Sequence, residues 1–443
     1  MGSILGTLFS FAIVFGILVF VHEFGHFFMA KLVGINVEVF SFGYGKRLFG
    51  FKKGGTDYRV SLIPMGGYVK FPGEDVFEEK RDIEPGDFLA ARRWQRLLVM
   101  VMGAVMNIIL AIILMAVINM VGVQTADIQY EVPVIGWIEP DSPAEKANLM
   151  KGDEILRING EKTGTWNDVK LAVGAKPDKE IEIEIQRGSE ILTIKLLTES
   201  ITRYAMGYAG FFGRIKPQAY MVSPRSPAEK AGMKSGDVIL EIDGRDLHYF
   251  EFVDILESNP NKEMDFLVDR DGERLHLMVT PRLEGDVGKI GLSHIQKSSL
   301  RKYGFFKAIK ESLAYNANLT FLVFRTIRDL VSGEASTKQL AGPIDIANFS
   351  YEAFRMGILA LMGWIAFISL QLGIINLFPI PVLDGGQILV LLLESIFRKD
   401  FSLKVKQVIM QIGFVMFIFL IVFVILNDVV KRLPNGWASL WPF

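Results

Sequence analysis

The sequence predicts a multi-pass α-helical membrane protein with four transmembrane helices, a membrane-associated β-hairpin and a duplicated domain between the second and third helices. Half of the 443 residues are hydrophobic and 22% are charged, a balance typical of membrane proteins that carry soluble domains. The apolar residues gather in four long stretches that contain almost no charge. Between the second and third stretches a six-residue motif recurs 84 residues later, which indicates the duplication.

About twenty apolar residues suffice to cross a bilayer, and four stretches reach that length. They lie at residues 4–30, 97–126, 356–383 and 407–427. The first contains no basic leader and no small-residue cleavage site, so we expect it to be retained. Asn376, Pro379 and Pro381 are expected to break the end of the third, because proline lacks the helical donor. The shorter apolar run 313–324 lies among lysines and arginines, which predicts an interfacial helix.

Basic residues predict the orientation in the membrane. The loop between the first two spans carries twelve of them, from Lys31 to Arg96, and none precedes the first span. The positive-inside rule therefore places this loop in the cytoplasm and residues 127–354 outside. Lys431 and Arg432 favour the opposite orientation but are outnumbered. The net charge of -1 argues against a nucleic-acid partner. The four apolar stretches instead predict that the lipid bilayer surrounds much of the chain.

The first span ends in the motif His22-Glu23-Phe24-Gly25-His26. A lone histidine on an apolar face is usually a core residue, but two histidines and a glutamate are costly in hydrocarbon without a partner. Residues i and i+4 share one helical face, so His22 and His26 can direct their imidazoles at one metal ion. Glu23 is offset by about a hundred degrees, where it can hold a water bound to the metal. The sequence therefore predicts a metal site.

The third ligand must be sought elsewhere in the chain. The sequence contains no cysteine, which limits a zinc site to histidine and carboxylate ligands. The three other histidines, His248, His276 and His294, fall outside the predicted spans and are expected at the surface. Two carboxylates remain beside the apolar stretches. Asp384 follows the broken third span at the depth of the histidine pair, whereas Glu394 is expected to be a solvated helix end.

The cytoplasmic loop contains a predicted β-hairpin at about residues 57–71. Two β-rich runs flank Pro64-Met65-Gly66-Gly67, a sequence typical of a turn. A hairpin that folds back among the spanning helices fits this pattern, because non-helical backbone is allowed in a membrane where protein or water surrounds it. An ordinary cytosolic hairpin fits equally well.

The duplicated region contains Ser142-Pro143-Ala144-Glu145-Lys146-Ala147 and its copy Ser226-Pro227-Ala228-Glu229-Lys230-Ala231. A Gly-Asp turn, a strand and an Asn-Gly or Asp-Gly turn follow in each copy, and the whole pattern resembles the PDZ domain. PDZ domains bind an extended peptide as an added strand. The resemblance places the groove beside Gly136 in the first copy and Met221 in the second. A closed groove that serves for packing or as a steric gate is equally compatible.

These predictions divide the chain into five segments. They are residues 1–126 with two spans and the hairpin, 127–204 and 205–296 with the PDZ domains, 297–354 with interfacial helices, and 355–443 with two spans.

The motifs together resemble the site-2 protease family of intramembrane zinc metalloproteases. HEFGH in the first span, NLFPIPVLDGG at the end of the third and the PDZ pair carry this resemblance, while LIPMGGYVKF is similar to the hairpin of the regulator of sigma-E protease branch. The resemblance implies Zn²⁺ held by His22, His26 and Asp384, with Glu23 as the catalytic base. Ala104 departs from the family's usual proline, which affects the local kink rather than the metal ligands.

The same resemblance implies the substrate and its contacts. Asn376 and the hairpin edge would bind the substrate main chain, the edge being Gly66, Gly67, Tyr68, Val69, Lys70 and Phe71. The expected substrates are single-span membrane proteins of the anti-sigma factor type and remnant signal peptides. They would be cleaved in a bacterial inner membrane with the PDZ domains on the periplasmic side. A membrane scaffold would need neither metal motif, and a metal transporter would need further polar residues along a path.

Overall fold

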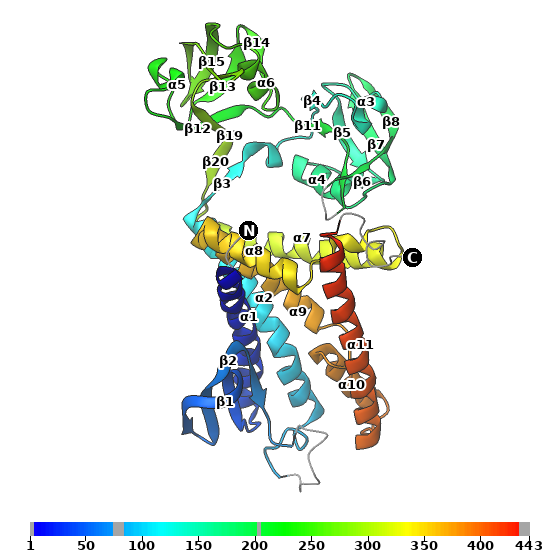
Figure 1. Cartoon of the computed structure of the whole chain (residues 1–443). Coiled ribbons are helices and arrows are strands. Elements are labelled where there is room, and N and C mark those ends of the chain that lie inside the picture. Colours follow the sequence, from blue (N-terminus) through cyan, green and yellow to red (C-terminus); the bar gives the residue numbers. More distant parts are fainter. Residues whose placement is uncertain (1–3, 74–83, 202–204, 434–443) are drawn as a thin grey trace. The chain divides into compact units, whose positions relative to one another are not determined.

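The computed structural model describes residues 4–73, 84–201 and 205–433 of the chain. They form two compact units (Figure 1). The helical unit comprises the residues up to 122, residues 302–332 and those from 337 onward. The repeat unit comprises residues 123–301 and 333–336.

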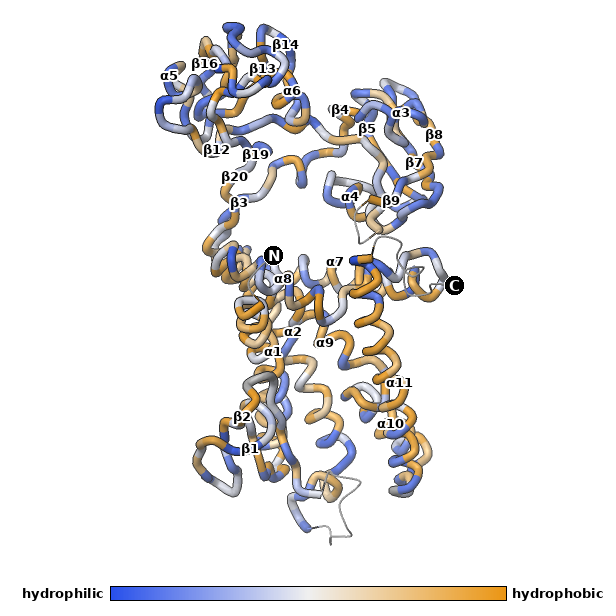
Figure 2. Tube along the Cα trace, in the orientation of Figure 1, coloured by the Kyte–Doolittle hydropathy of each residue, from blue (hydrophilic) through white to orange (hydrophobic). Residues whose placement is uncertain are grey.

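Long helices dominate the helical unit, and four of them are long and apolar enough to cross a membrane: α1, α2, α9 and α11. Figure 2 shows that these helices are apolar along most of their length. The prediction of four candidate membrane helices is confirmed. The elements of this unit are α1 (Ile4–Val33), β1 (Val39–Lys53), β2 (Thr56–Lys70), α2 (Arg93–Val121), α7 (Phe305–Val331), η2 (Thr337–Gln339), α8 (Pro343–Met356), α9 (Ile358–Asn376), α10 (Asp384–Ile396) and α11 (Leu403–Val430).

The third apolar stretch breaks where its prolines predict. Helix α9 ends at Asn376, a non-helical segment contains both prolines, and α10 begins at Asp384. The two glycines after Asp384 permit this tight connection. A Cβ at Gly385 would fall on the main chain of Leu377 and Phe378, and one at Gly386 on that of Ile380 and Pro381. The break therefore places a carboxylate at the start of a new helix beside the last turn of α9.

The hairpin differs from its prediction. Strands β1 and β2 are joined by a tight turn at Gly54-Gly55, which the sequence did not predict. Residues 39–42 of β1 pair antiparallel with residues 67–70 of β2 and also lie beside residues 57–60 in parallel register. Both glycines of the turn have positive φ, 58° and 79°, as a two-residue hairpin turn with φ > 0 at both positions requires. Gly66 also has positive φ but lies within β2. Residues 57–60 and 67–70 thus run in opposite directions on either side of residues 39–42. Strand β2 therefore reverses near the predicted turn, but the two predicted runs pair with β1 and not with each other.

The interfacial helices predicted before the third span are α7 and α8. Helix α7 packs on α2 through a buried serine, because Ser312 Oγ donates to the main-chain carbonyl of Ile112 at 2.7 Å. On its other side Phe306 and Phe321 remain 85% and 74% exposed. Such an apolar face beside basic residues is typical of a helix at a membrane surface.

Glu394 is not the solvated helix end that its position predicts. Its side chain is fully buried, accepts the Phe401 N–H at 2.9 Å and pairs with Lys406 Nζ at 2.8 Å. Because Lys406 belongs to the first turns of α11, this pair ties α10 to α11. The prediction failed because the loop 397–402 folds back over the helix end, which sequence periodicity does not reveal.

The repeat unit contains two copies of one small α/β domain. The first copy has a sheet of order β6-β5-β7-β8, and the second has the order β16-β15-β13-β12-β19 with β14 beside β13. The first copy contains β4 (Trp137–Ile138), α3 (Pro143–Lys146), β5 (Glu154–Ile158), β6 (Glu161–Lys162), α4 (Trp166–Gly174), β7 (Glu180–Arg187), β8 (Glu190–Leu197), β9 (Glu199–Ile201), β10 (Met206–Tyr208) and β11 (Phe211–Phe212).

The second copy repeats the order of elements. It contains β12 (Pro217–Val222), α5 (Pro227–Lys230), β13 (Val238–Ile242), β14 (Arg245–Asp246), α6 (Glu251–Glu257), β15 (Met264–Arg270), β16 (Glu273–Val279), β17 (Arg282–Glu284), β18 (Val287–Lys289) and β19 (Leu292–Gln296). A separate pair joins the two ends of the unit and comprises β3 (Val123–Ala126), followed by η1 (Asp127–Tyr130), and β20 (Ser298–Arg301). The core of the first copy includes Ala209 and Phe211, beyond the boundary predicted at residue 204.

The aspartate of each Gly-Asp turn anchors its copy. Both aspartates, Asp153 and Asp237, are 1% exposed. Asp153 accepts two hydrogen bonds from Arg187, and Asp237 accepts two from Arg270, all at 2.7–2.8 Å. The hydrogen bonds to Asp237 raise the pKa of Arg270 above its ordinary value, so the guanidinium stays charged at neutral pH. A bidentate arginine–carboxylate pair is among the stronger polar contacts in proteins, which explains why both copies contain it.

Replacing Asp237 with alanine should destabilise the second copy by about 3 kcal/mol, because Arg270 and the Lys234 N–H lose a buried acceptor. Hydrogen exchange of the β15 amides measures this local free energy of unfolding. Lys262→Ala, which removes a largely exposed ion pair with Asp243 in the same copy, should change it by less than about 1 kcal/mol. Equal effects of the two substitutions would contradict the anchoring role.

Candidate metal centre

Helix α1 presents both histidines of the motif on the face that packs against α2. His22 and His26 are 8% and 7% exposed, one helical turn apart. Two glycines make room for them between the helices. A Cβ at Gly103 of α2 would collide with His26 and lie 2.8 Å from His22 Cε1, while one at Gly25 of α1 would lie 2.8 Å from the Met102 carbonyl carbon. Sequence reasoning missed this role of Gly103, because only the pairing of the helices reveals it.

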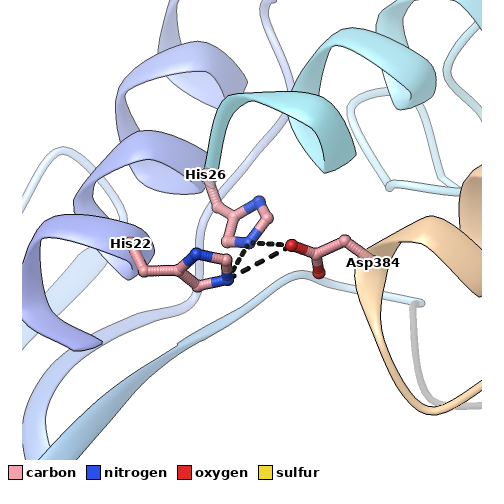
Figure 3. A group of neighbouring side chains, drawn as sticks. All are labelled: His22, His26 and Asp384. Carbon is pink, nitrogen blue, oxygen red and sulfur yellow. Dashed lines mark hydrogen bonds and ion pairs between the residues drawn. The ribbon is translucent and has the colours of Figure 1, made fainter. Parts of the chain in front are cut away.

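Asp384 completes the group from the start of α10. Its Oδ2 lies 3.2 Å from His22 Nε2 and 3.4 Å from His26 Nε2, and the two Nε2 atoms are 3.2 Å apart (Figure 3). In Figure 3 both imidazole rings direct a nitrogen at the same carboxylate oxygen. Among the described residues these three side chains form a cluster able to hold a metal ion. Residues separated by more than 350 positions in the chain thus meet at one point.

The spacing of the three atoms fits zinc. Ligand atoms about 2.0–2.1 Å from a zinc ion at tetrahedral angles lie about 3.3 Å apart. The three distances between ligand atoms are 3.2, 3.2 and 3.4 Å. Two imidazoles and one carboxylate are also a donor set typical of catalytic zinc, which leaves the fourth position open. The residues present therefore fit the metal.

The second nitrogen of each imidazole faces α2. His26 Nδ1 lies 2.8 Å from the Val99 carbonyl, which can only accept, so this nitrogen carries the proton and Nε2 is free to bind metal. His22 Nδ1 lies 3.4 Å from the side-chain amide of Asn107, which is fully buried. Asn376, at the end of α9, is 9% exposed and lies 3.4 Å from His22 Nε2. Of these groups, sequence reasoning gave a role only to Asn376.

Glu23 lies beside the group rather than in it. Its Oε2 accepts the Val69 N–H of β2 at 3.0 Å, so the hairpin is bonded to the predicted catalytic base. A Cβ at Gly67 would lie 3.8 Å from Glu23 Cγ, which shows that β2 passes close to this side chain. The structure thus brings the strand and the metal cluster to one region of the helical unit.

The other residues of the predicted hairpin edge differ in their surroundings. Gly66 and Gly67 are buried, and Tyr68 forms a hydrogen bond with Arg59. Lys70 pairs with Glu38 at 3.5 Å. Phe71 is 3% exposed and stacks on Phe88 with ring centres 5.3 Å apart.

The two predicted contacts in the repeat unit, Gly136 and Met221, lie on main chain that already has partners. The Gly136 N–H donates to the Phe212 carbonyl at 2.8 Å, and Met221 lies opposite Ser293 where β12 pairs with β19. A cavity of about 310 Å³ lies instead between α4 and residues 207–213 of the first copy. The roles of Gly136 and Met221 remain predictions.

One of the three remaining histidines departs from its predicted surface position. His248 is 6% exposed, and its Nε2 bonds to the Gly213 carbonyl at 2.8 Å. Burial lowers the pKa of His248 and the hydrogen bond to Gly213 opposes this shift, so the ring is neutral at pH 7. The prediction was wrong because the ring packs on Trp137, with centres 5.5 Å apart, in a contact between distant parts of the sequence.

Gly103→Ala should weaken zinc binding by at least tenfold, because the added methyl group displaces one imidazole from the common point. Gly363→Ala is a matched control in helix α9, where a Cβ meets only Ile118 Cδ1 at 3.8 Å. Zinc affinity measured by competition with a chelator distinguishes them. Parental affinity in the Gly103 variant would contradict the close packing of α1 and α2.

Several known proteins are similar to this chain over nearly its whole length. The model of peptidase family M50 matches residues 10–420. The regulator of sigma E protease of Salmonella typhi and RseP of Escherichia coli are each 32% identical, covering 96% of this chain and 99% of theirs. A Vibrio cholerae protein whose name describes a zinc metalloprotease is also 32% identical, covering 97% of this chain and 99% of its own. A PDZ domain from Listeria monocytogenes matches 18% of this chain and 86% of its own, at 18% identity and a TM-score of 0.17. The chain belongs to peptidase family M50, the zinc-dependent site-2 proteases.

Proposed function

We propose that this chain is an intramembrane zinc endopeptidase that cleaves single-span membrane proteins. The observation that carries the proposal is the meeting of three side chains, with Glu23 alongside. His22 and His26 lie on a helix apolar enough to span a membrane, and Asp384 begins α10, directly after another such helix, α9, is broken. The names of its relatives, which describe regulators of sigma E, support substrates of the anti-sigma factor type. Remnant signal peptides are a second substrate class of the same chemistry, a single apolar helix.

The residues around the metal divide the work of peptide hydrolysis. A bound zinc supplies Lewis-acid chemistry, which activates water and polarises the scissile carbonyl. The Glu23 carboxylate takes the proton of the attacking water and delivers it to the leaving amine nitrogen. Asn376 is near enough to the cluster to hold the substrate main chain with its side-chain amide. His22, His26 and Asp384 fix the position at which attack occurs.

A transmembrane substrate must unwind before cleavage, because a helix engages its carbonyls in its own hydrogen bonds. Strand β2 supports a route to the extended form. Its Val69 N–H points away from β1 and toward Glu23, so it lies on the edge where a substrate strand would add. Strand addition there would present the scissile bond beside the catalytic base.

Sequence and family together support the proposed location. The basic loop between α1 and α2 supports a cytoplasmic position for the hairpin and an external position for the repeat unit in a bacterial inner membrane. The cavity beside α4 supports a role for the first PDZ-like copy in docking or filtering substrates by an extended segment.

Glu23→Gln should abolish cleavage of a single-span peptide and leave zinc content unchanged, because glutamine keeps the shape and the Val69 contact but cannot accept a proton. Product formation and metal analysis on the same purified sample check this. Residual turnover near the parental rate would contradict the assignment of Glu23.

Val69→Pro should lower cleavage at least tenfold without loss of zinc, because proline removes the N–H that faces Glu23 and the incoming strand. Val69→Ala retains this donor and serves as the matched control. If the proline variant cleaves as fast as the alanine variant, β2 does not present the substrate.

A further inference from the structure

Asn107 is a buried polar residue to which the proposed mechanism gives no task. It lies on α2 with no exposed surface, its Nδ2 is 3.4 Å from His22 Nδ1, and its Oδ1 has no hydrogen-bond partner among the described residues. A buried carbonyl without a donor costs about 1–3 kcal/mol. Such an atom next to a metal ligand calls for a physical reason.

The requirements of the metal supply that reason. His22 Nε2 faces Asp384 and His26 Nε2, so it must keep its lone pair for the metal. Its proton must therefore sit on Nδ1, which then needs an acceptor. With the amide oriented as it stands, Asn107 directs a donor at Nδ1. A half-turn of the amide exchanges oxygen and nitrogen without changing its shape. Either orientation leaves one polar atom of the Asn107 amide without a partner, so hydrogen bonding within the protein does not choose between them. The metal does, because it requires the proton of His22 on Nδ1.

Asn376 is the alternative acceptor, but its position argues against it. Its Nδ2 lies 3.5 Å from His22 Nδ1 and 3.4 Å from His22 Nε2. An atom equidistant from both nitrogens does not lie along the direction of the Nδ1–H bond. Asn107 is in contact with Nδ1 alone. Ser369 does not satisfy this side chain, because its Oγ donates to the main-chain carbonyl of Asn107 at 2.8 Å.

The register of the helices extends the argument to both histidines. Val99, Gly103 and Asn107 follow one another at four-residue spacing along α2, and so share a face. Val99 accepts from His26, Gly103 leaves room for the rings, and Asn107 faces His22. His26 faces Val99 and His22 faces Asn107, so α1 and α2 run antiparallel along this stripe. One helix supplies the metal ligands and the other their outer partners.

We propose that Asn107 is a positioning residue of the metal centre, whose side-chain oxygen accepts the Nδ1 proton of His22 and thereby directs Nε2 at the metal. The inference rests on the proposed metal ligands. It assigns to α2 the task of fixing the tautomer of both histidines, through a main-chain carbonyl for His26 and a side chain for His22.

Two substitutions of full-length protein in detergent test the proposal. Asn107→Leu has a similar volume and no acceptor, and it should weaken zinc binding by about 10–100-fold in competition with a chelator. Asn107→Asp keeps an acceptor and should retain zinc binding. Ser369→Ala removes a hydrogen bond to the main chain of Asn107, which helix α2 holds without it, and should leave zinc affinity unchanged. Thermal unfolding of the metal-free proteins shows whether each variant folds.

Parental zinc affinity in a folded Asn107→Leu variant would overturn the proposal, as would equal weakening by leucine and aspartate. Should the leucine variant fail to fold, nitrogen NMR of the parental zinc-bound protein decides. Zinc on His22 Nε2 with the proton on Nδ1 supports the proposal, and zinc on Nδ1 overturns it. Failure of the parental protein to bind zinc would instead contradict the proposed function, so the two failures are distinguishable.

Discussion

The close packing of α1 against α2 is the constraint on which the metal centre depends. Gly25 and Gly103 remove the side chains that would hold the helices apart, and the space is filled by two imidazoles. Burying ionisable side chains among apolar helices is costly unless each polar atom finds a partner. Helix α2 supplies the Val99 carbonyl on one side of the histidines, and Asp384 approaches from the other.

The broken third span is the second requirement. A continuous helix would carry Asp384 past the histidines, whereas the proline segment after Asn376 turns the chain and starts α10 at the carboxylate. The far end of α10 is held as well, because buried Glu394 bonds to Phe401 and Lys406. Helix α10 is thus fixed at both ends, which limits the freedom of the ligand at its start.

Much of the site was predictable because its signals are local or follow from topology. The spacing of His22 and His26 defines a helical face, and the depth of two apolar stretches brings Asp384 to the same level. The misses share a physical cause. The roles of Gly103 and Asn107, like the burial of Glu394 and His248, depend on which distant segment packs beside them. The pairing of the hairpin was mispredicted for the same reason, because residues 39–42, outside the predicted hairpin, pair with both of its runs.

The position of the cut in a membrane-embedded substrate tests the central claim most directly. The purified protein would be reconstituted in lipid vesicles with a single-span peptide, and the products identified by mass spectrometry. The account predicts zinc-dependent cleavage within the apolar segment of the peptide. A zinc-loaded protein that cuts only outside that segment, or not at all, would contradict it.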